Sequence, residues 1–198
     1  MSAVTTIEAL TQSEPSSIEQ LAGLLVACVE AGASVSFMHP LGMDRARDFW
    51  RGVLDGAARG ERIVLVARDA QGPVPGRAEA GPAAAQGSER GGKGRIVGTV
   101  QVITAQPDNQ PHRADVAKML VHPDARRQGV GERLMRAAES AARRAGKTLL
   151  VLDTASDVAA RLYARCGWTE VGTIPHFALG PQGGFCATTI FYRRLPST

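Results

Sequence analysis

The sequence has few cysteines, few aromatic residues and no long apolar run. Its three cysteines, Cys28, Cys166 and Cys186, are odd in number and scattered, which is typical of reduced thiols rather than of a disulfide framework or a metal cluster. The longest nearly apolar run, residues 21–29, is far shorter than the ~20 residues that span a bilayer. The first residues also lack the basic start and apolar stretch of a secretion signal. We therefore expect a cytoplasmic protein without a metal site and without a membrane as its partner.

The 198 residues are 44% apolar and 21% charged, which is ordinary for a globular protein. Domains typically have ~100–200 residues, so the chain length predicts a single domain over residues 1–198. Residues 70–95 differ from the rest, because ten of these 26 residues are glycine or proline. Such a composition does not build a packed core, so we expect a flexible loop that joins two strands.

The net charge of +4 is unevenly distributed along the chain. Residues 126–147 hold seven basic and two acidic side chains, a local charge of +5 that leaves −1 for the remainder. A positive field over a glycine-rich turn suggests a polyanionic ligand, although a solvated helix face is the simpler explanation of the charge alone. A nucleic-acid-binding module is a further alternative, but the sequence has no clear readout motif and its aromatic residues do not interleave with the arginines.

The pattern of apolar residues predicts an α/β domain. In the first half we expect a strand, a helix capped by Ser16 or Ser17, a second helix and two strands, over residues 5–10, 18–29, 44–59, 62–68 and 95–104. The second half reads strand, helix, strand, helix, strand, strand, over residues 115–121, 129–144, 148–153, 156–166, 168–174 and 185–194. The apolar run within 148–153 indicates a strand buried on both faces. Together these elements predict a mixed twisted sheet of about six to seven strands flanked by about four helices.

The segment after the strand at 115–121 contains the pattern Arg126-x-x-Gly129-x-Gly131. Glycines let the backbone turn tightly and approach a ligand, and the amides at a helix start bind anions with the support of the helix dipole. Arg126 and Arg127 add charge that suits a diphosphate. A purely structural turn is one alternative. A dinucleotide site is another, because Asp153 follows Gly131 by 22 residues, but the third glycine of that motif is missing.

Two motifs on either side of the predicted helix at 129–144 belong together. Val121-x-Pro123 and the glycine turn precede the helix, and Leu162-Tyr163-x-x-x-Gly167-Trp168 follows it. With both motifs, residues 115–168 resemble the core of the GNAT superfamily of N-acetyltransferases. The resemblance implies the GNAT fold and an enzyme that moves an acetyl group from acetyl-CoA to an amine of a small molecule, without metal or nucleic acid, in a chain that can pair as a homodimer. A CoA-binding sensor without chemistry is the alternative.

The resemblance also implies which residues hold the cofactor. The family's diphosphate lies on the glycine turn, and its pantetheine pairs like an extra strand with the end of the preceding strand. Carried over to this sequence, the positions are Met119, Leu120, Val121, Arg126, Arg127, Gln128, Gly129, Val130, Gly131 and Ser156. Ser156 stands where the family often has asparagine, so it can cap a helix but loses an amide contact to the cofactor.

Acetyl transfer to an amine needs a proton acceptor, a donor for the carbonyl oxygen and a proton for the leaving thiolate. Tyr163 matches the family's tyrosine near the CoA sulfur and is the candidate acid, with a packing role as the alternative. Asp115 and Asp153 are the candidate bases, and a strand-end carboxylate without a catalytic role is the alternative for each. We expect a main-chain amide of residues 119–121 to receive the carbonyl oxygen.

A closer likeness to the tabtoxin-resistance acetyltransferases is carried by residues 109–115, 118–121 and 149–154. The positions of Asp115 and Asp153 match acids thought to be catalytic in that group, where the first is a glutamate, so that Asp115 is a shorter equivalent. The likeness favours a small, toxin-like amine as the acceptor. His112 and His176 are candidate contacts for that amine.

Overall fold

The computed structural model describes residues 5–69 and 94–196. Its strands are β1 (Thr5–Leu10), β2 (Arg62–Asp69), β3 (Arg95–Ile103), β4 (Arg113–Val121), β5 (Leu149–Thr154), β6 (Thr169–Leu179) and β7 (Phe185–Arg194). Its helices are α1 (Pro15–Glu30), α2 (Met43–Ala58), α3 (Val130–Arg144) and α4 (Asp157–Arg165), and a short 3-10 helix, η1 (Pro123–Ala125), precedes α3. The loop predicted over 70–95 lies outside the described residues except for its last two positions.

The seven described strands form one sheet in the order β1-β2-β3-β4-β5-β7-β6. Strands β1 to β4 are antiparallel neighbours, β4 and β5 are parallel on either side of the crossover through α3, and β7 lies antiparallel between β5 and β6. The predicted mixed sheet flanked by four helices is confirmed. The dinucleotide alternative is wrong, because a Rossmann sheet needs successive parallel strands and the described sheet has one parallel pair.

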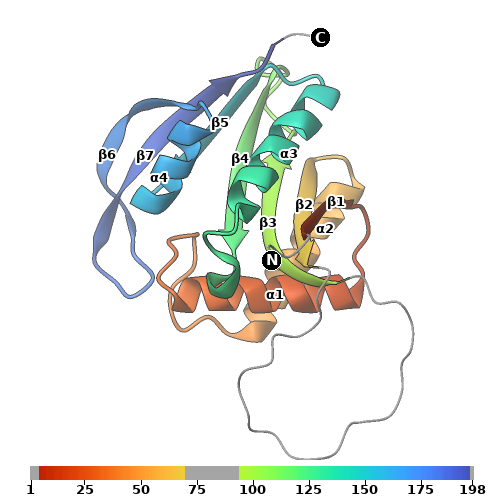
Figure 1. Cartoon of the computed structure of the whole chain (residues 1–198), viewed down its shortest axis with the longest axis vertical. Helices are drawn as coiled ribbons and strands as arrows, with labels where there is room; N and C mark the ends of the chain where they lie inside the picture. The colour runs from red at the N-terminus through yellow and green to blue at the C-terminus, as the bar shows by residue number, and fades with distance from the viewer. Residues whose placement is uncertain (1–4, 70–93, 197–198) are drawn as a thin grey trace, which may run out of the picture.

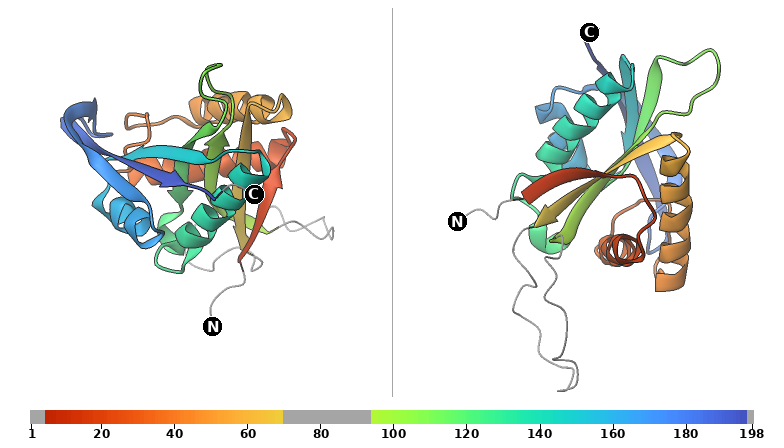
Figure 2. Two further views of the ribbon diagram at one scale, coloured as in Figure 1. Left: turned by 90° about the horizontal axis from the view of Figure 1, so that it is seen from above. Right: turned by 90° about the vertical axis from the view of Figure 1, so that its right-hand side faces the viewer.

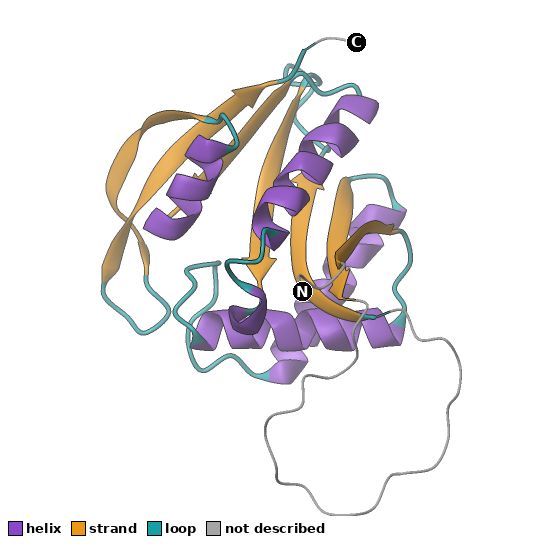
Figure 3. Ribbon diagram, in the orientation of Figure 1, coloured by secondary structure: helices purple, strands orange, loops and turns teal. Residues whose placement is uncertain are grey.

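Helices cover both faces of this sheet, as Figure 3 shows by secondary structure. Helices α3 and α4 lie on one face, and α1 and α2 lie on the other (Figure 2). The α3 side encloses an apolar cluster that includes Leu134, Met135 and Phe191, and the α1 side encloses a second cluster that includes Leu25 and Trp50. The sheet is therefore held between two cores, each built from one face of its strands.

The two serines expected to cap the first helix do not do so. Helix α1 begins at Pro15 after Glu14, and its start has no side-chain cap. Proline suits this position, because the first N–H of a helix has no partner within the helix. The buried Ser17 instead accepts a hydrogen bond from the Arg68 guanidinium at 3.4 Å. The second predicted cap is confirmed, since Ser156 Oγ accepts from the N–H of Ala159 at 3.3 Å.

Strand β5 is buried on one face, which corrects the expected burial on both. Leu150 and Leu152 are buried in the core on the α3 side, whereas Leu149 and Val151 on the opposite face are half-buried. Helices α1 and α2 cover that opposite face mainly over β2, β3 and β4. The next residue on the less covered face of β5 is the exposed Asp153.

Strands β4 and β5 separate soon after they begin. Their parallel register consists of Arg113 with Leu149, Ala114 with Leu150 and Asp115 with Val151. Figure 1 shows the two strands together near their starts and apart toward their ends. Beyond Asp115, the described part of β4 has no partner strand on its β5 side, so main-chain donors and acceptors along this edge are not used by the sheet.

The hairpin of β6 and β7 forms the other edge of the sheet and exposes large apolar side chains, among them Val171, Phe177 and Phe185. Strand β6 is exposed along almost its whole length. Within the described ranges, no helix has both the length and the apolarity needed to cross a membrane.

Leu134 provides a test of the packing between α3 and the sheet. Its side chain is fully buried, and one of its methyl groups lies 3.0 Å from the point where a Cβ on Gly98 of β3 would stand. We expect Leu134→Ala to lower the free energy of unfolding by about 2–5 kcal/mol, because the lost contacts leave a cavity that the sheet cannot fill. Urea denaturation measures the loss. The control is Arg136→Ala on the exposed side of α3, expected to change stability by less than about 0.5 kcal/mol; equal losses in the two variants would contradict this packing.

Candidate functional site

The glycine turn joins β4 to α3 through η1. Gly129 is the N-cap residue of α3 with φ 75°, and Arg127 also has a positive φ of 61°. The start of α3 has no side-chain cap, so the amides of its first turn keep their donors free of such a partner. With the positive end of the helix dipole at the same place, this turn has the physical properties of an anion site.

Polar side chains hold the turn in shape from outside. Gln128 Nε2 donates to the carbonyl of Asp124 at 3.0 Å, and Arg126 Nε donates to the carbonyl of Val121 at 3.3 Å. Arg126 and Arg127 are both exposed, so their charge faces solvent beside the helix start. An anion that reached the turn would meet main-chain amides and two guanidinium groups together.

Gly131 is the point where β4, α3 and α4 meet. A Cβ at this position would lie 2.9 Å from Leu162 Cδ2, 3.6 Å from Met119 Cε and 3.9 Å from Val121 Cγ2. The first distance is shorter than real Cβ contacts, so a larger residue at position 131 would force the Leu162 side chain of α4 to shift. The predicted glycine turn, strand end and Leu-Tyr motif are thus brought together by the fold.

The end of β4 contains a bulge. Thr99 of β3 pairs with Leu120 and Gln101 pairs with Ala117, so β4 has one more residue than β3 over this stretch. Lys118 absorbs the irregularity with a φ of 50°. Before the bulge Val116 packs toward α3, and after it Met119 and Val121 do so, which means that the bulge reverses which side chains face each side of the sheet.

Tyr163 lies in the core on the α3 side and not in open solvent. The residue is 5% exposed, and its ring contacts Phe191 and Trp168, with ring centroids 5.8 and 6.2 Å away. Burial, and secondarily the charge of Asp153, raises the pKa of the phenol well above its usual value. The packing role is therefore present. Tyr163 directly follows Leu162, the residue whose side chain lies against Gly131 at the start of α3.

The two candidate bases have different surroundings. Asp153 is exposed near the end of β5 and accepts a hydrogen bond from Thr188 Oγ1 at 2.7 Å. Asp115 lies where β4 and β5 are still paired, and its carboxylate accepts from Gln106 Nε2 at 3.1 Å and from Arg113 Nη2 at 3.3 Å. Asp153 thus stands where the strands have separated, whereas Asp115 is tied into a side-chain network at their start.

The remaining predicted residues are less closely joined to the turn. Ser156 uses its oxygen to cap α4. His112 precedes β4 at the end opposite the glycine turn, and its carbonyl accepts from Thr148 N. His176 lies on the exposed edge strand β6 with its ring stacked on Phe185 at 5.3 Å. The substrate-contact role of either histidine stays a prediction.

Lys118 is a further candidate site residue, which no sequence motif had indicated as one. Its ammonium donates to Ser36 Oγ at 3.1 Å and lies 5.7 Å from the ring centroid of Phe49. Burial lowers the pKa of Lys118, and the charge of Asp153 partly opposes this change. The available signal was a lysine within the apolar strand segment 115–121, but only the structure shows the bulge that directs it away from α3.

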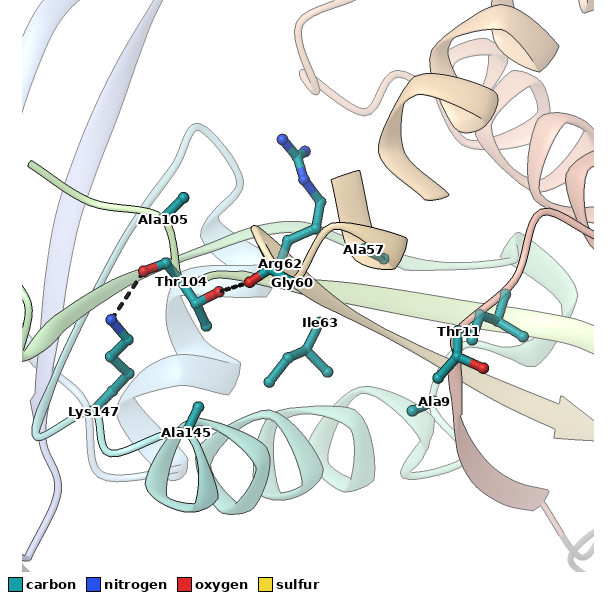
Figure 4. Close-up of a pocket in the computed structure, with 11 residues that line it drawn as sticks. Ala9, Thr11, Ala57, Gly60, Arg62, Ile63, Thr104, Ala105, Ala145 and Lys147 are labelled. Atoms are coloured by element: carbon teal, nitrogen blue, oxygen red, sulfur yellow. Dashed lines mark hydrogen bonds between the residues drawn. The ribbon is translucent and has the colours of Figure 1, made fainter. Parts of the chain in front are cut away.

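A separate cavity of about 490 Å³ lies between the end of β1, the start of β2 and the C-terminal end of α3 (Figure 4). Ile63, Thr104 and Lys147 are among its lining residues, and none of the predicted site residues is. Lys147 Nζ donates to the carbonyls of Thr104 and Pro111 at 2.9 and 2.8 Å. The C-terminal end of α3 carries the negative end of the helix dipole, so this cavity is a poor place for a diphosphate.

Comparisons with known proteins agree with this geometry. A family model described as an acetyltransferase (GNAT) domain matches residues 60–170. The structure of yncA from Salmonella typhimurium with its cofactor acetyl-CoA superposes with a TM-score of 0.71 at 16% identity, covering 99% of this chain and 96% of that one. A GCN5-related N-acetyltransferase from Kribbella flavida gives a TM-score of 0.70 at 20% identity, covering 96% and 98%. Ribosomal-protein-alanine N-acetyltransferase from Brucella melitensis gives 0.69 at 18%, covering 96% and 99%.

Gly129 and Gly146 offer a matched pair of substitutions at the two ends of α3. Both are exposed, have φ near 75° (75° and 73°) and have open space where a Cβ would stand. We expect each valine variant to lose stability by at least about 1–2 kcal/mol, because side chains avoid this conformation. Gly129→Val should also weaken acetyl-CoA binding at least about 10-fold, because the turn then loses its anion-binding shape.

Calorimetric titration of each variant with acetyl-CoA measures the difference, with thermal melts to follow stability. Gly146→Val should bind acetyl-CoA like the wild type. Equal affinity in the Gly129→Val and Gly146→Val proteins would show that the turn at Gly129 does not hold the diphosphate.

Proposed function

Because the chain belongs to the acetyltransferase (GNAT) family, we propose that it transfers an acetyl group from acetyl-CoA to the amine of a small molecule. The observation that carries the proposal is the meeting, at Gly131, of an uncapped helix start with the end of β4. The amides of the helix start suit a diphosphate. The β4 edge beyond Asp115 suits an extended chain of amides, because the sheet leaves it unpaired.

The residues present fit acetyl-CoA. Main-chain amides from Gln128 to Gly131, together with Arg126 and Arg127, would hold its diphosphate, and Val130 fixes the first turn of α3 by packing into the core. The strand end from Met119 to Val121 would hydrogen-bond the pantetheine. When bound, acetyl-CoA supplies the activated acetyl thioester.

The chemistry requires a C–N bond to form and a C–S bond to break. Asp153, with its carboxylate oriented by Thr188, would accept the proton that the amine gives up. A main-chain amide at the end of β4 would donate to the carbonyl oxygen as negative charge develops there, a contribution of ~3 kcal/mol in comparable sites. Tyr163 would give its proton to the departing thiolate, and since its raised pKa keeps the phenol neutral at ordinary working pH, that proton is available.

The closer likeness to the tabtoxin-resistance acetyltransferases is part of this proposal. Its support is the exposed position of Asp153 on the less covered face of β5, beyond the last residue pair that joins β5 to β4. We place the base at Asp153 rather than at Asp115, whose carboxylate is held by Arg113 and Gln106.

The burial of Tyr163 favours a second candidate, a protein that binds CoA without chemistry. A thiol-release screen with acetyl-CoA and a panel of amines, amino acids, polyamines and amine antibiotics separates the two. Release that depends on an added amine supports the enzyme. Binding of acetyl-CoA without release for any amine supports the sensor.

Tyr163→Phe tests the proposed acid. We expect kcat to fall by about 100-fold or more, because the thiolate leaves without a positioned proton donor, while the Kd for acetyl-CoA stays nearly unchanged. Tyr192→Phe is the control, since Tyr192 is the second of two tyrosines and should change kcat by less than about three-fold. Steady-state kinetics and calorimetry measure the two quantities. Normal turnover in the Tyr163→Phe protein would leave that residue with packing alone.

Asp153→Asn and Asp115→Asn together assign the base. We expect Asp153→Asn to lower kcat by about 100-fold or more, since an amide does not accept the amine proton. Asp115→Asn should cost at most about 10-fold, through disturbed positioning at the start of the strands. Higher pH should restore part of the Asp153→Asn activity, because more of the amine is then already deprotonated. The reverse order of the two losses would move the base to Asp115.

A further inference from the structure

Lys118 occupies an unusual backbone position beside the proposed reaction centre. It is the residue of β4 that absorbs the bulge, with a positive φ of 50° that non-glycine residues rarely adopt. The bulge turns its side chain to the face opposite α3, which is also the face of β5 that carries Asp153. A strained position that places a charged group next to a site is a reason to look for a role in that site.

The surroundings of the Lys118 ammonium are poor in negative charge. It donates to the neutral hydroxyl of Ser36 and lies over the ring of Phe49. Within residues 5–69 and 94–196, no carboxylate lies within ion-pair distance of it. Lys118 is half-buried, and a hydroxyl and an aromatic face compensate its charge only in part, which agrees with its lowered pKa.

The segment between α1 and α2 holds this ammonium in place. Ser36, which also has a positive φ, lies on that segment, and His39 N of the same segment donates to the carbonyl of Pro181 in the β6–β7 hairpin at 2.8 Å. Ser34 Oγ lies 3.8 Å from Cys186 Sγ in β7. The segment is thus fastened to the hairpin on one side and to β4 on the other, so Lys118 is presented from a supported position rather than from a free loop.

Asp153 supplies the opposite charge on the same face. The register of β4 and β5 and the bulge place both side chains on the face opposite α3, and the charge of Asp153 acts to raise the pKa of Lys118. None of the described ion pairs joins the two residues. An ammonium and a carboxylate that face one site without forming an ion pair can each bind an opposite charge on a ligand. An α-amino acid carries an amine and a carboxylate on one carbon, so a single small molecule can meet both.

We infer that the acceptor of the acetyl group is an α-amino acid whose carboxylate is bound by Lys118 while its amine faces Asp153. This inference rests on the proposed function and names its substrate class. It explains why a lysine stands at the bulge, where the carboxylate would supply the charged partner that the chain itself does not provide. It also assigns the Phe37–Phe49 edge-to-face pair, with ring centroids 5.1 Å apart, to one wall beside the carboxylate.

The alternative role for Lys118 is to tie Ser36 to β4. That role needs a hydrogen-bond donor but no bound anion, so it predicts no difference between acceptors with and without a carboxylate. The two roles can therefore be distinguished by comparing acceptors with the wild-type protein, without relying on a substitution that could disturb the fold.

The test compares each of several L-amino acids with its own carboxamide in the acetyl-CoA thiol-release assay. The amine of an amino-acid amide is less basic than that of the acid, so without recognition the amide would react at least as well. We expect the wild type to favour the acid at least about 10-fold in kcat/KM for its best substrate, as one charged hydrogen bond is worth ~1.5–3 kcal/mol. Lys118→Met should remove the preference by raising KM for the acid with kcat little changed, and Lys118→Arg should keep part of it.

The controls and outcomes separate a failure of the amino-acid inference from a failure of the proposed acetyltransferase function. Unchanged melting temperature and acetyl-CoA affinity in Lys118→Met show that a changed preference is not unfolding. Acetylation of amides and simple amines without preference for the acids, or a preference that survives in Lys118→Met, would overturn the inference and leave the proposed function standing. No thiol release with any amine, acid or amide, would overturn both.

Discussion

The separation of β4 from β5 is the constraint on which the rest of the molecule depends. Three residue pairs join these strands, and beyond Asp115 the edge of β4 is released from the sheet. Gly131 lies next to this edge, where a Cβ would stand close to Leu162 of α4 and to Met119 and Val121 of β4. A helix start, a free strand edge and the Leu-Tyr motif are thereby brought to one place. None of these three features is a binding site by itself, and the candidate site is formed where they lie together.

The two faces of the sheet differ in burial and charge near the site. On the α3 side, Tyr163 packs between Trp168 and Phe191, and the same burial that stabilises the core keeps its phenol protonated. On the opposite face the cover of α1 and α2 ends before β5, so Asp153 is exposed there, with Lys118 directed to the same face by the bulge. The packed aromatic residues thus lie on the α3 side of the sheet, and the charged residues Asp153 and Lys118 lie on the opposite face.

The sequence allowed most of the fold to be predicted, because its apolar periodicity and glycine punctuation are strong in the second half. The strand at 148–153 was misjudged, since four apolar letters do not reveal that helices cover one face of a strand more than the other. The glycine turn was found by motif, but the motif does not show the close contact of Gly131 with Leu162, 31 residues away in the chain. Lys118 was missed because a bulge depends on the register of two strands and has no local signature. Pairing of two copies stays a prediction.

Amide hydrogen exchange with and without acetyl-CoA tests the central claim most directly, because the claim concerns main-chain donors. If these donors hold the cofactor, exchange slows on binding in two segments, residues 119–121 at the end of β4 and residues 129–132 at the start of α3. Exchange around the cavity near Ile63 and Lys147 stays unchanged. Protection at that cavity, with none at the glycine turn, would contradict the account.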